Sequence, residues 1–146
     1  MCASAALLSG CYQGVVLKPI QGSSTKPSPL MDPRGAFKSG RFYVDLDNIK
    51  KPFLHEECTG RWEPAAAPNV ASTDNLADAW DVIYGTGYYE KGVLSAKQCA
   101  RGSGMSKHGT KLEAEMCQFE MEFKGKIRLI ARGVAKDNNN NFYRIN

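Results

Sequence analysis

The chain has 146 residues, of which 42% are hydrophobic and 23% charged, and its formal net charge is +4. This composition is typical of a single globular domain that is long enough to bury a hydrophobic core. No segment approaches the ~20 consecutive apolar residues of a membrane-spanning helix. The longest basic run, Lys50-Lys51, is too short to follow a nucleic-acid backbone, so we predict no nucleic-acid partner.

An apolar run near the N-terminus leads into small residues and a cysteine. The tetrad Leu8-Ser9-Gly10-Cys11 resembles the lipobox of bacterial lipoproteins, whose leader is cleaved before the cysteine that then becomes acylated. The resemblance implies a lipid anchor at Cys11, with residues 1–10 as a residual signal-like segment. The apolar run is shorter than a complete signal peptide and lacks a basic start. We therefore expect that the true start lies upstream of Met1 or that the leader is truncated.

The residue after the cysteine is Tyr12 instead of Asp. By resemblance to enteric lipoproteins, this implies the outer membrane or the periplasm. Residues 11–36 form an N-terminal tether in this interpretation. Gly14–Gln21 is a short strand that Pro19 confines to a sheet edge, and Gly22–Gly35 is irregular because it contains three prolines among Ser, Thr and Gly.

Residues 37–146 are predicted to form one β-rich globular domain. Phe37–Leu46 is a strand with alternating apolar residues, Phe53–Trp62 is a weaker strand, and Glu63–Ala71 is a proline-containing loop. Apolar residues at helical spacing (Leu76, Ala79, Trp80 and Ile83) predict a helix over residues 73–84, which Gly85 ends. Gly87–Leu94 is read as a further strand. Ser95–Thr110 is polar and glycine-rich, which predicts a mobile loop.

The segment Lys111–Ala135 alternates apolar and charged residues on both sides of Lys124-Gly125. That pattern predicts a hairpin with a tight turn, and a β-bulge near Met116–Cys117 is expected because the alternation slips there. The asparagine-rich stretch 136–141 is a turn, and Phe142–Ile145 is the last strand. The C-terminus is thus a three-strand meander.

These elements predict an α+β fold that is mostly β. We expect a curled antiparallel sheet, or a small sandwich or barrel, with the one helix packed on it. The predicted core residues are Val44, Leu46, Trp80, Ile83, Cys117, Phe119 and either Ile127 or Ile130.

The five cysteines are Cys2, Cys11, Cys58, Cys99 and Cys117. In an oxidising compartment, the last three allow one disulfide and one free thiol. We favour Cys99–Cys117, which would flank the predicted glycine-rich loop. Cys58–Cys117 and a fully reduced set remain as alternatives. No Cys-x-x-Cys pair is present and the two histidines are isolated, so no metal or cofactor is predicted.

Catalytic patterns are weak throughout the chain. His55 and Cys58 would point to opposite faces of a strand, and Gly102–Lys107 lacks the spacing of a phosphate-binding loop. Several glutamates alternate with apolar residues, as on the solvent face of a sheet, and nothing predicts their convergence (Glu113, Glu115, Glu120 and Glu122).

The sequence therefore predicts a non-catalytic envelope lipoprotein that acts by binding, as an accessory component of a cell-surface assembly. The predicted contact surface is the basic loop 97–111, whose charged residues favour an envelope protein or an anionic envelope polymer (Lys97, Arg101, Lys107, His108 and Lys111). The alternative is a small exported hydrolase, or an inhibitor-type module, with a cleft between sheet and helix.

Overall fold

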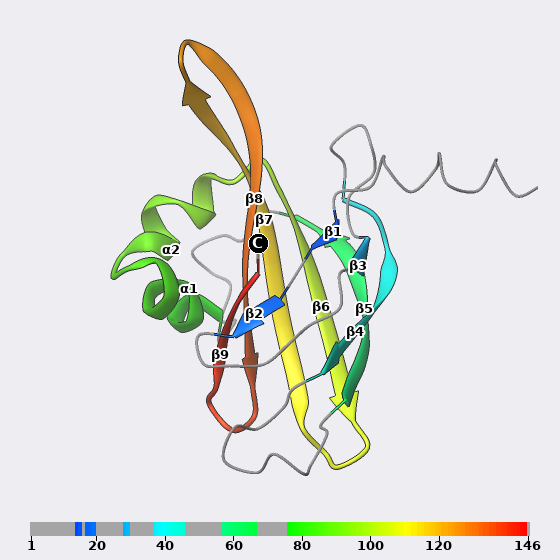
Figure 1. Ribbon diagram of the computed structural model, residues 1–146. Coiled ribbons are helices and arrows are strands. Elements are labelled where there is room, and N and C mark those ends of the chain that lie inside the picture. The colour runs from blue at the N-terminus through cyan, green and yellow to red at the C-terminus, as the bar shows by residue number, and fades with distance from the viewer. Residues whose placement is uncertain are drawn as a thin grey trace, which may run out of the picture.

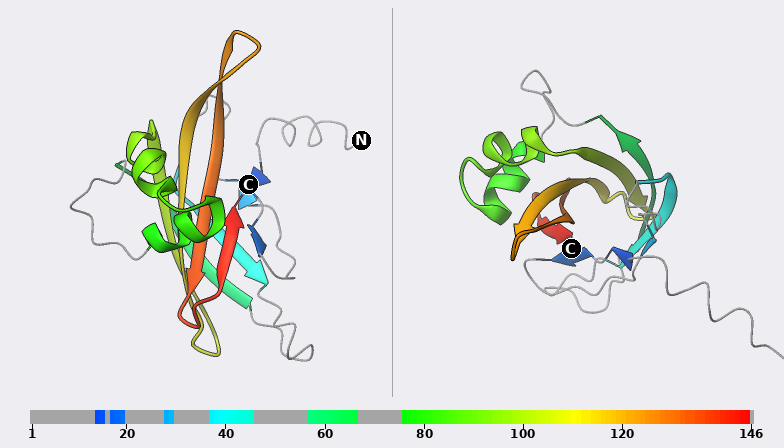
Figure 2. Two further views of the ribbon diagram at one scale, coloured as in Figure 1. Left: turned by 90° about the vertical axis from the view of Figure 1, so that its left-hand side faces the viewer. Right: turned by 90° about the horizontal axis from the view of Figure 1, so that it is seen from above.

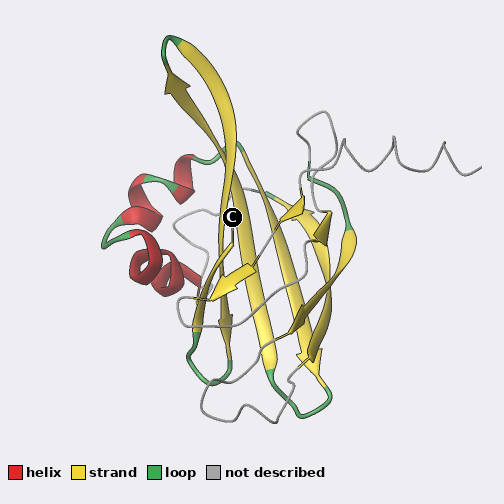
Figure 3. Ribbon diagram, in the orientation of Figure 1, coloured by secondary structure: helices red, strands yellow, loops and turns green. Residues whose placement is uncertain are grey.

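Antiparallel strands make up most of the computed structural model, which describes residues 14–15, 17–19, 28–29, 37–45, 57–66 and 76–145 (Figures 1 and 3). The strands are β1 (Gly14–Val15), β2 (Leu17–Pro19), β3 (Ser28–Pro29), β4 (Gly40–Asp45), β5 (Glu57–Ala65), β6 (Gln98–Ser106), β7 (Lys111–Phe123), β8 (Lys126–Asp137) and β9 (Phe142–Ile145). Seven of them form one sheet in the order β2-β9-β8-β7-β6-β5-β4, and β1 pairs with β3 separately. The mostly-β prediction and the C-terminal meander β7-β8-β9 are confirmed.

The main sheet curls around an interior and remains open, with β2 and β4 as its end strands (Figure 2, right). Two short helices, α1 (Leu76–Tyr84) and α2 (Tyr88–Lys91), and the 3₁₀ turn η2 (Val93–Ser95) lie outside the curl against its outer face. The sheet therefore has an apolar layer on each side. The predicted packed helix is confirmed from Leu76 onward, and residues 73–75 lie outside the described residues.

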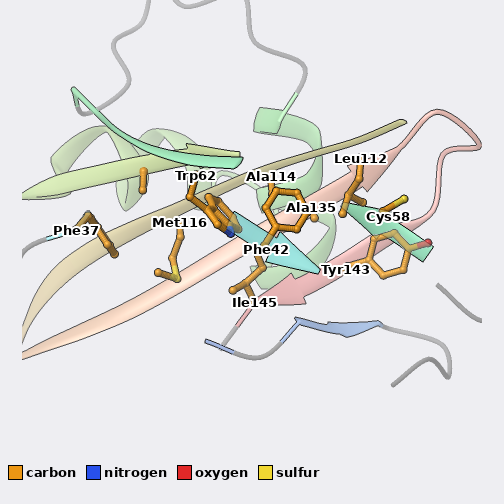
Figure 4. Close-up of a cluster of buried hydrophobic side chains, with 11 residues drawn as sticks. Phe37, Phe42, Cys58, Trp62, Leu112, Ala114, Met116, Ala135, Tyr143 and Ile145 are labelled. Carbon is orange, nitrogen blue, oxygen red and sulfur yellow. The ribbon is translucent and has the colours of Figure 1, made fainter. Parts of the chain in front are cut away.

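The inner core fills the curl with aromatic and aliphatic side chains from strands far apart in the sequence (Figure 4). Its members include Phe42 from β4, Trp62 from β5, Leu112 and Met116 from β7, and Ile145 from β9. Phe42 and Trp62 contact each other with ring centroids 5.4 Å apart. Because these residues lie on a single face of each strand, the alternation in the sequence places them in one layer.

Glycines in β6 make room for these rings. A Cβ atom added at Gly102 would lie 2.7 Å from the Trp62 ring, and one at Gly104 would lie 2.8 Å from the Phe42 ring. The glycines that favoured a mobile loop thus mark a close approach between a strand and aromatic side chains. Residues 98–106 form a strand in the middle of the sheet, and the prediction of a loop over Ser95–Thr110 is wrong.

The outer core lies between the helices and the sheet, and Trp80 is at its centre. Its ring contacts Tyr84, Tyr88 and Phe119 at centroid distances of 5.4, 5.9 and 6.3 Å. The Trp80 indole Nε1 also donates a 2.9 Å hydrogen bond to Oε1 of the buried Glu115. Helix α1 is thereby attached to β7 through both an apolar contact and a buried polar one.

The slip in the alternation of β7 has a simple cause that is not a bulge. Pairing with β8 is continuous from Leu112↔Asp137 to Phe123↔Lys126. Leu112 and Met116 face the inner core, whereas Cys117 and Phe119 face the outer core. The two parities reflect two buried faces, so the predicted bulge near Met116–Cys117 is wrong.

The segment Gly87–Leu94 is helical in the structure, and its prediction as a strand is wrong. Gly87 has a positive φ of 79° and reverses the chain after α1. The Asp81 carboxylate then accepts hydrogen bonds from the backbone N–H of Tyr89 (2.9 Å) and of Gly87 (3.0 Å). These bonds lower the pKa of Asp81, and they occupy N–H groups that a strand would use in a ladder.

The disulfide Cys99–Cys117 is present, as predicted, but in a different setting. The two cysteines are directly paired neighbours on β6 and β7, with Cα atoms 4.1 Å apart, and both are buried in the outer core. The bond joins two central strands and flanks no loop. Cys58 is buried and lies outside the disulfide, and its Sγ donates a 3.7 Å hydrogen bond to the Thr110 carbonyl oxygen.

The turn between β8 and β9 is organised by the buried carboxylate of Asp137. It accepts bonds from the backbone N–H groups of Asn139 (2.8 Å) and Asn141 (2.9 Å), from the Asn141 amide, and from the Tyr143 hydroxyl (2.9 Å). Asn140 has a φ of 61°, in the left-handed region that asparagine tolerates. The predicted turn is confirmed.

Most of the predicted core positions that can be compared are confirmed. Trp80 and Cys117 are fully buried, and Ile83 and Phe119 pack against the outer core. Ile127 is exposed, which makes that alternative of the prediction wrong. Leu46 and the side chain of Val44 lie outside the described residues, as do Cys2, Cys11 and His55.

Candidate functional site

Strands β7 and β8 extend beyond all their neighbours as a two-stranded ribbon (Figures 1 and 2). Pairing of β6 with β7 ends at Gln98↔Gln118, and pairing of β8 with β9 ends at Gly133↔Ile145. Residues 119–123 therefore pair only with residues 126–130 among the described strands, and residues 131–132 pair only with β7. We call residues 119–132 the β7–β8 arm.

A two-residue turn closes the arm at its far end. Lys124 and Gly125 both have positive φ, 51° and 71°, and they connect the directly paired residues Phe123 and Lys126. Positive φ at both central positions matches the right-handed twist of the flanking strands. The predicted tight turn at Lys124-Gly125 is confirmed, and the tip of the arm is defined as Phe123–Arg128.

Large apolar side chains are exposed on the arm. Among the described residues, four of the six exposed large hydrophobic side chains belong to it: Ile127 (72% exposed), Phe123 (51%), Leu129 (45%) and Met121 (41%). A two-stranded ribbon has no third strand to cover such side chains. Clustered apolar exposure of this kind marks an interaction site.

The register distributes these side chains over both faces of the ribbon. Phe119, Met121 and Phe123 share one face with their partners Ile130, Arg128 and Lys126. Glu120 and Glu122 share the other face with Leu129 and Ile127. Each face thus combines apolar with charged side chains, and neither is the purely polar face expected of a solvated strand.

Charge is separated along the length of the arm. Three cations, Lys124, Lys126 and Arg128, lie at the tip. The Arg128 guanidinium is 5.3 Å from the Phe123 ring centroid, and the Lys124 Nζ is 5.5 Å from it. Nearer the base, Glu120 forms a 2.9 Å ion pair with Lys97. The tip is therefore cationic and apolar at once.

The base of the arm is fixed to the body of the protein. Phe119 packs edge-on against the rings of Trp80 and Tyr88, with centroids 6.3 and 6.4 Å apart. On the other face, the Gln98 amide donates a 2.8 Å hydrogen bond to Gln118. The Cys99–Cys117 disulfide lies one residue further into the sheet. The arm is thus a projection with an anchored origin.

The predicted basic contact surface is not assembled in the structure. Lys97 precedes β6 and Arg101 lies within it, where its Nε donates a 2.8 Å bond to Glu115 Oε2. Lys107 and His108 lie in the turn after β6, and Lys111 begins β7. These five residues are spread from just before β6, through that strand and the turn that follows it, to the start of β7, and do not form one loop. Arg101 and Lys97 are each engaged by a glutamate.

Sequence reasoning missed the arm because its alternation is the same as that of a half-buried hairpin. A signal for it was present in the lengths: β7 has 13 residues and β8 has 12, whereas β6 has 9 and β9 has 4. When both strands of a hairpin are longer than the strands beside them, the end of the hairpin must project beyond the rest of the sheet. The neighbours' lengths were hidden by the interpretation of β6 as a loop.

The described part of the chain contains no group of three or more His, Cys, Asp or Glu side chains arranged to hold a metal ion. Within it, no helix is both long and apolar enough to cross a membrane. Comparison of the chain with protein-family models, with curated proteins and with solved structures finds no match.

Proposed function

We propose that this protein is a non-catalytic lipoprotein of the bacterial cell envelope that acts by binding, as an accessory component of a cell-surface assembly, with the β7–β8 arm as its contact surface. The observation that carries the proposal is the exposure of Met121, Phe123, Ile127 and Leu129 on a projecting ribbon. An isolated ribbon of this kind gains little stability by itself, so its apolar side chains are best explained by a partner.

The interface between helices and sheet supports binding over catalysis. An enzyme of the alternative class would need a cleft there. That space holds the stacked rings of Trp80, Tyr84 and Tyr88, and the Tyr84 hydroxyl is used in a 3.1 Å bond to the Gly133 carbonyl oxygen. The Trp80 indole and the Tyr84 and Tyr88 hydroxyls in this layer are all used in structural hydrogen bonds.

Two features support the envelope as the compartment. The disulfide Cys99–Cys117 is of a kind that forms and persists in oxidising compartments such as the periplasm. The lipobox-like tetrad ending at Cys11 would attach the chain to a membrane. A single acyl chain binds membranes only marginally, and firm attachment needs several chains or a second contact. The arm is a candidate for such a contact.

Crosslinking in intact envelopes tests the role of the arm. A photo-crosslinking residue at Ile127 is expected to capture a defined envelope component, and the same residue at Val82, which is 58% exposed on α1, serves as the control. The double substitution Phe123→Ser with Leu129→Ser should abolish the adduct. An identical set of adducts from positions 127 and 82 would show that the arm is not the contact surface.

Labelling with a fatty-acid probe tests the compartment. The protein, expressed with its natural leader, should incorporate the probe, and Cys11→Ser should lose it. Absence of label on the unchanged protein would refute the lipoprotein assignment. The arm could still be a contact surface in that case, so the two tests are independent.

A further inference from the structure

We infer that the tip of the β7–β8 arm, Phe123–Arg128, docks onto the interfacial region of an anionic phospholipid bilayer. The inference rests on the proposed function, because an acyl chain at Cys11 would keep the domain beside a bilayer. The partner of the tip is identified by its chemistry, as a surface that is negatively charged on the outside and apolar a short distance beneath.

The first argument is that each face of the tip carries an exposed large apolar side chain. Phe123 belongs to one face of the ribbon and Ile127 to the other, and they are the two most exposed large apolar side chains of the arm. A protein surface that covered one face would leave the other in water. A bilayer interface surrounds an inserted tip, so both side chains are removed from water together.

The second argument is where the charges lie. Lys124, Lys126 and Arg128 occur within the same six residues as the two exposed apolar side chains. Each Lys or Arg close to an anionic leaflet strengthens binding roughly fivefold, and long cationic side chains can reach headgroup phosphates while their apolar stems stay in the interface. The cation–ring contacts with Phe123 hold two of these charges beside an apolar anchor.

The third argument fixes the depth of insertion. Glu122 lies directly opposite Ile127, and Glu120 is paired with Lys97 nearer the base. Anionic headgroups repel carboxylates, and Glu122 stands level with Ile127, so we expect the tip to insert no deeper than the headgroup region. The outer backbone edges of the arm are also unpaired among the described strands. Such edges require hydrogen-bonding partners that headgroups and water provide and hydrocarbon does not.

A second copy of the chain fits the arm less well. In an antiparallel pairing of two β8 edges centred on Leu129, Lys126 of one copy lies opposite Arg132 of the other. In a pairing of two β7 edges centred on Met121, Glu120 lies opposite Glu122. Like charges directly opposite one another destabilise a strand pair, and charged edges are a common protection against such pairing.

Vesicle flotation tests the inference with the oxidised full chain carrying Cys11→Ser, so that no acyl chain can anchor it. We expect flotation with phosphatidylethanolamine vesicles that contain phosphatidylglycerol, no flotation with phosphatidylcholine alone, and a decline with added salt. Phe123→Ser with Ile127→Ser should reduce partitioning roughly 20-fold through the lost apolar burial. Lys124→Glu and Arg128→Glu should each reduce it at least about fivefold.

Matched controls come from the body. Val82→Ser removes an exposed apolar side chain on α1, and Lys107→Glu reverses an exposed charge in the turn after β6. Both should float like the parent. Flotation that the arm substitutions leave unchanged, or no flotation at all, would overturn the inference. The inference would also be overturned if sedimentation showed that the arm substitutions dissociate an oligomer in solution while flotation persists.

The outcome also separates this inference from the proposed function. If the position-127 crosslinker captures an envelope protein and no variant floats, the arm binds a protein: the lipid inference fails and the proposed function stands. If neither crosslinking nor flotation depends on the arm, both fail.

Discussion

The two halves of β7 have nearly the same pattern of residues and opposite surroundings. From Ala114 to Gln118 the strand is covered on both faces, by the inner core on one side and the helices on the other. From Glu120 to Phe123 it is exposed on both. Local sequence specifies the strand and its alternation in both halves, but burial is decided by which other elements reach that length of the strand.

The same contrast separates two ion pairs of similar geometry. Arg101–Glu115 and Lys97–Glu120 have N···O distances of 2.8 and 2.9 Å. Their side chains are 36% and 1% exposed in the first pair and 58% and 52% exposed in the second. Equal distances therefore conceal unequal energies, because water screens the pair at the arm and is excluded from the carboxylate in the body.

The largest expected effect comes from breaking the buried pair. Arg101→Ala removes the cation from the buried Glu115 carboxylate, to which the Trp80 indole still donates, and we expect a loss of roughly 3–5 kcal/mol in the free energy of unfolding. Lys97→Ala should cost at most about 1 kcal/mol. Urea unfolding monitored by tryptophan fluorescence measures both. Similar losses for the two variants would refute the distinction between body and arm.

Removal of the disulfide is expected to come next. The bond closes a separation of 18 residues, for which loop entropy predicts a contribution of about 3 kcal/mol. The variant with Cys99→Ser and Cys117→Ser should therefore unfold at lower urea concentration. The parent protein in reducing agent should match it. If the reduced parent protein were as stable as the oxidised one, the strand pairing between β6 and β7 would hold them together without help from the disulfide.

Alanine at two glycines compares steric crowding in the body with backbone strain in the arm. At Gly104 the added methyl group would meet the Phe42 ring at 2.8 Å, which overpacks the inner core at a cost of roughly 1–3 kcal/mol. At Gly125 the added methyl group would meet no atom of the described residues within 4 Å, but φ is +71°, so alanine costs about 1 kcal/mol. Thermal unfolding should rank the two variants in this order. If Gly125→Ala were the less stable of the two variants, the Phe42 ring would not lie against Gly104 as the structure has it.

Tyr143 gives the inner core a dependence on alkaline pH. Burial, together with the hydrogen bond to Asp137, raises the pKa of Tyr143 above its ordinary value near 10. The folded protein keeps a proton that the unfolded chain loses above about pH 10, so this contribution to stability is complete below that pH and declines above it. Tyr143→Phe should cost about 1 kcal/mol at neutral pH and make the alkaline decline shallower. If the stabilities of the parent protein and of Tyr143→Phe fell equally steeply as the pH rises above about 10, this prediction would be wrong.

Sequence reasoning recovered the elements that local chemistry determines. The turn at Lys124-Gly125, the helix end at Gly85 and the Asp137–Asn141 turn all depend on residues that tolerate or favour particular backbone angles. It failed where a distant partner decides the structure. The glycines of β6 lie under Trp62 and Phe42, which are 40 and 62 positions away from Gly102 and Gly104 in the chain. Helix α2 forms where Asp81 accepts the N–H groups of Gly87 and Tyr89.

The candidate site was missed for the same reason. A basic contact loop was predicted over residues that instead build a central strand, and Arg101 and Lys97 are used in ion pairs. The exposed arm was read as core, with Ile127 among its possible members. An alternating segment is half-buried where neighbouring strands extend along it, and it projects where they do not. The lengths of those neighbours cannot be read from the sequence of the segment itself.

The smallest expected effect on stability belongs to the arm, and it completes the comparison. Phe123→Ser with Ile127→Ser removes two large apolar side chains that are already in water, so we expect a change of no more than about 0.5 kcal/mol in the free energy of unfolding. The same chemical change in the body, Ile145→Ser, should cost several-fold more because Ile145 is fully buried in the inner core. Urea unfolding of the three proteins decides this. A large loss for the arm variant would mean that Phe123 and Ile127 stabilise the fold, and their exposure would then no longer indicate a site kept for a partner.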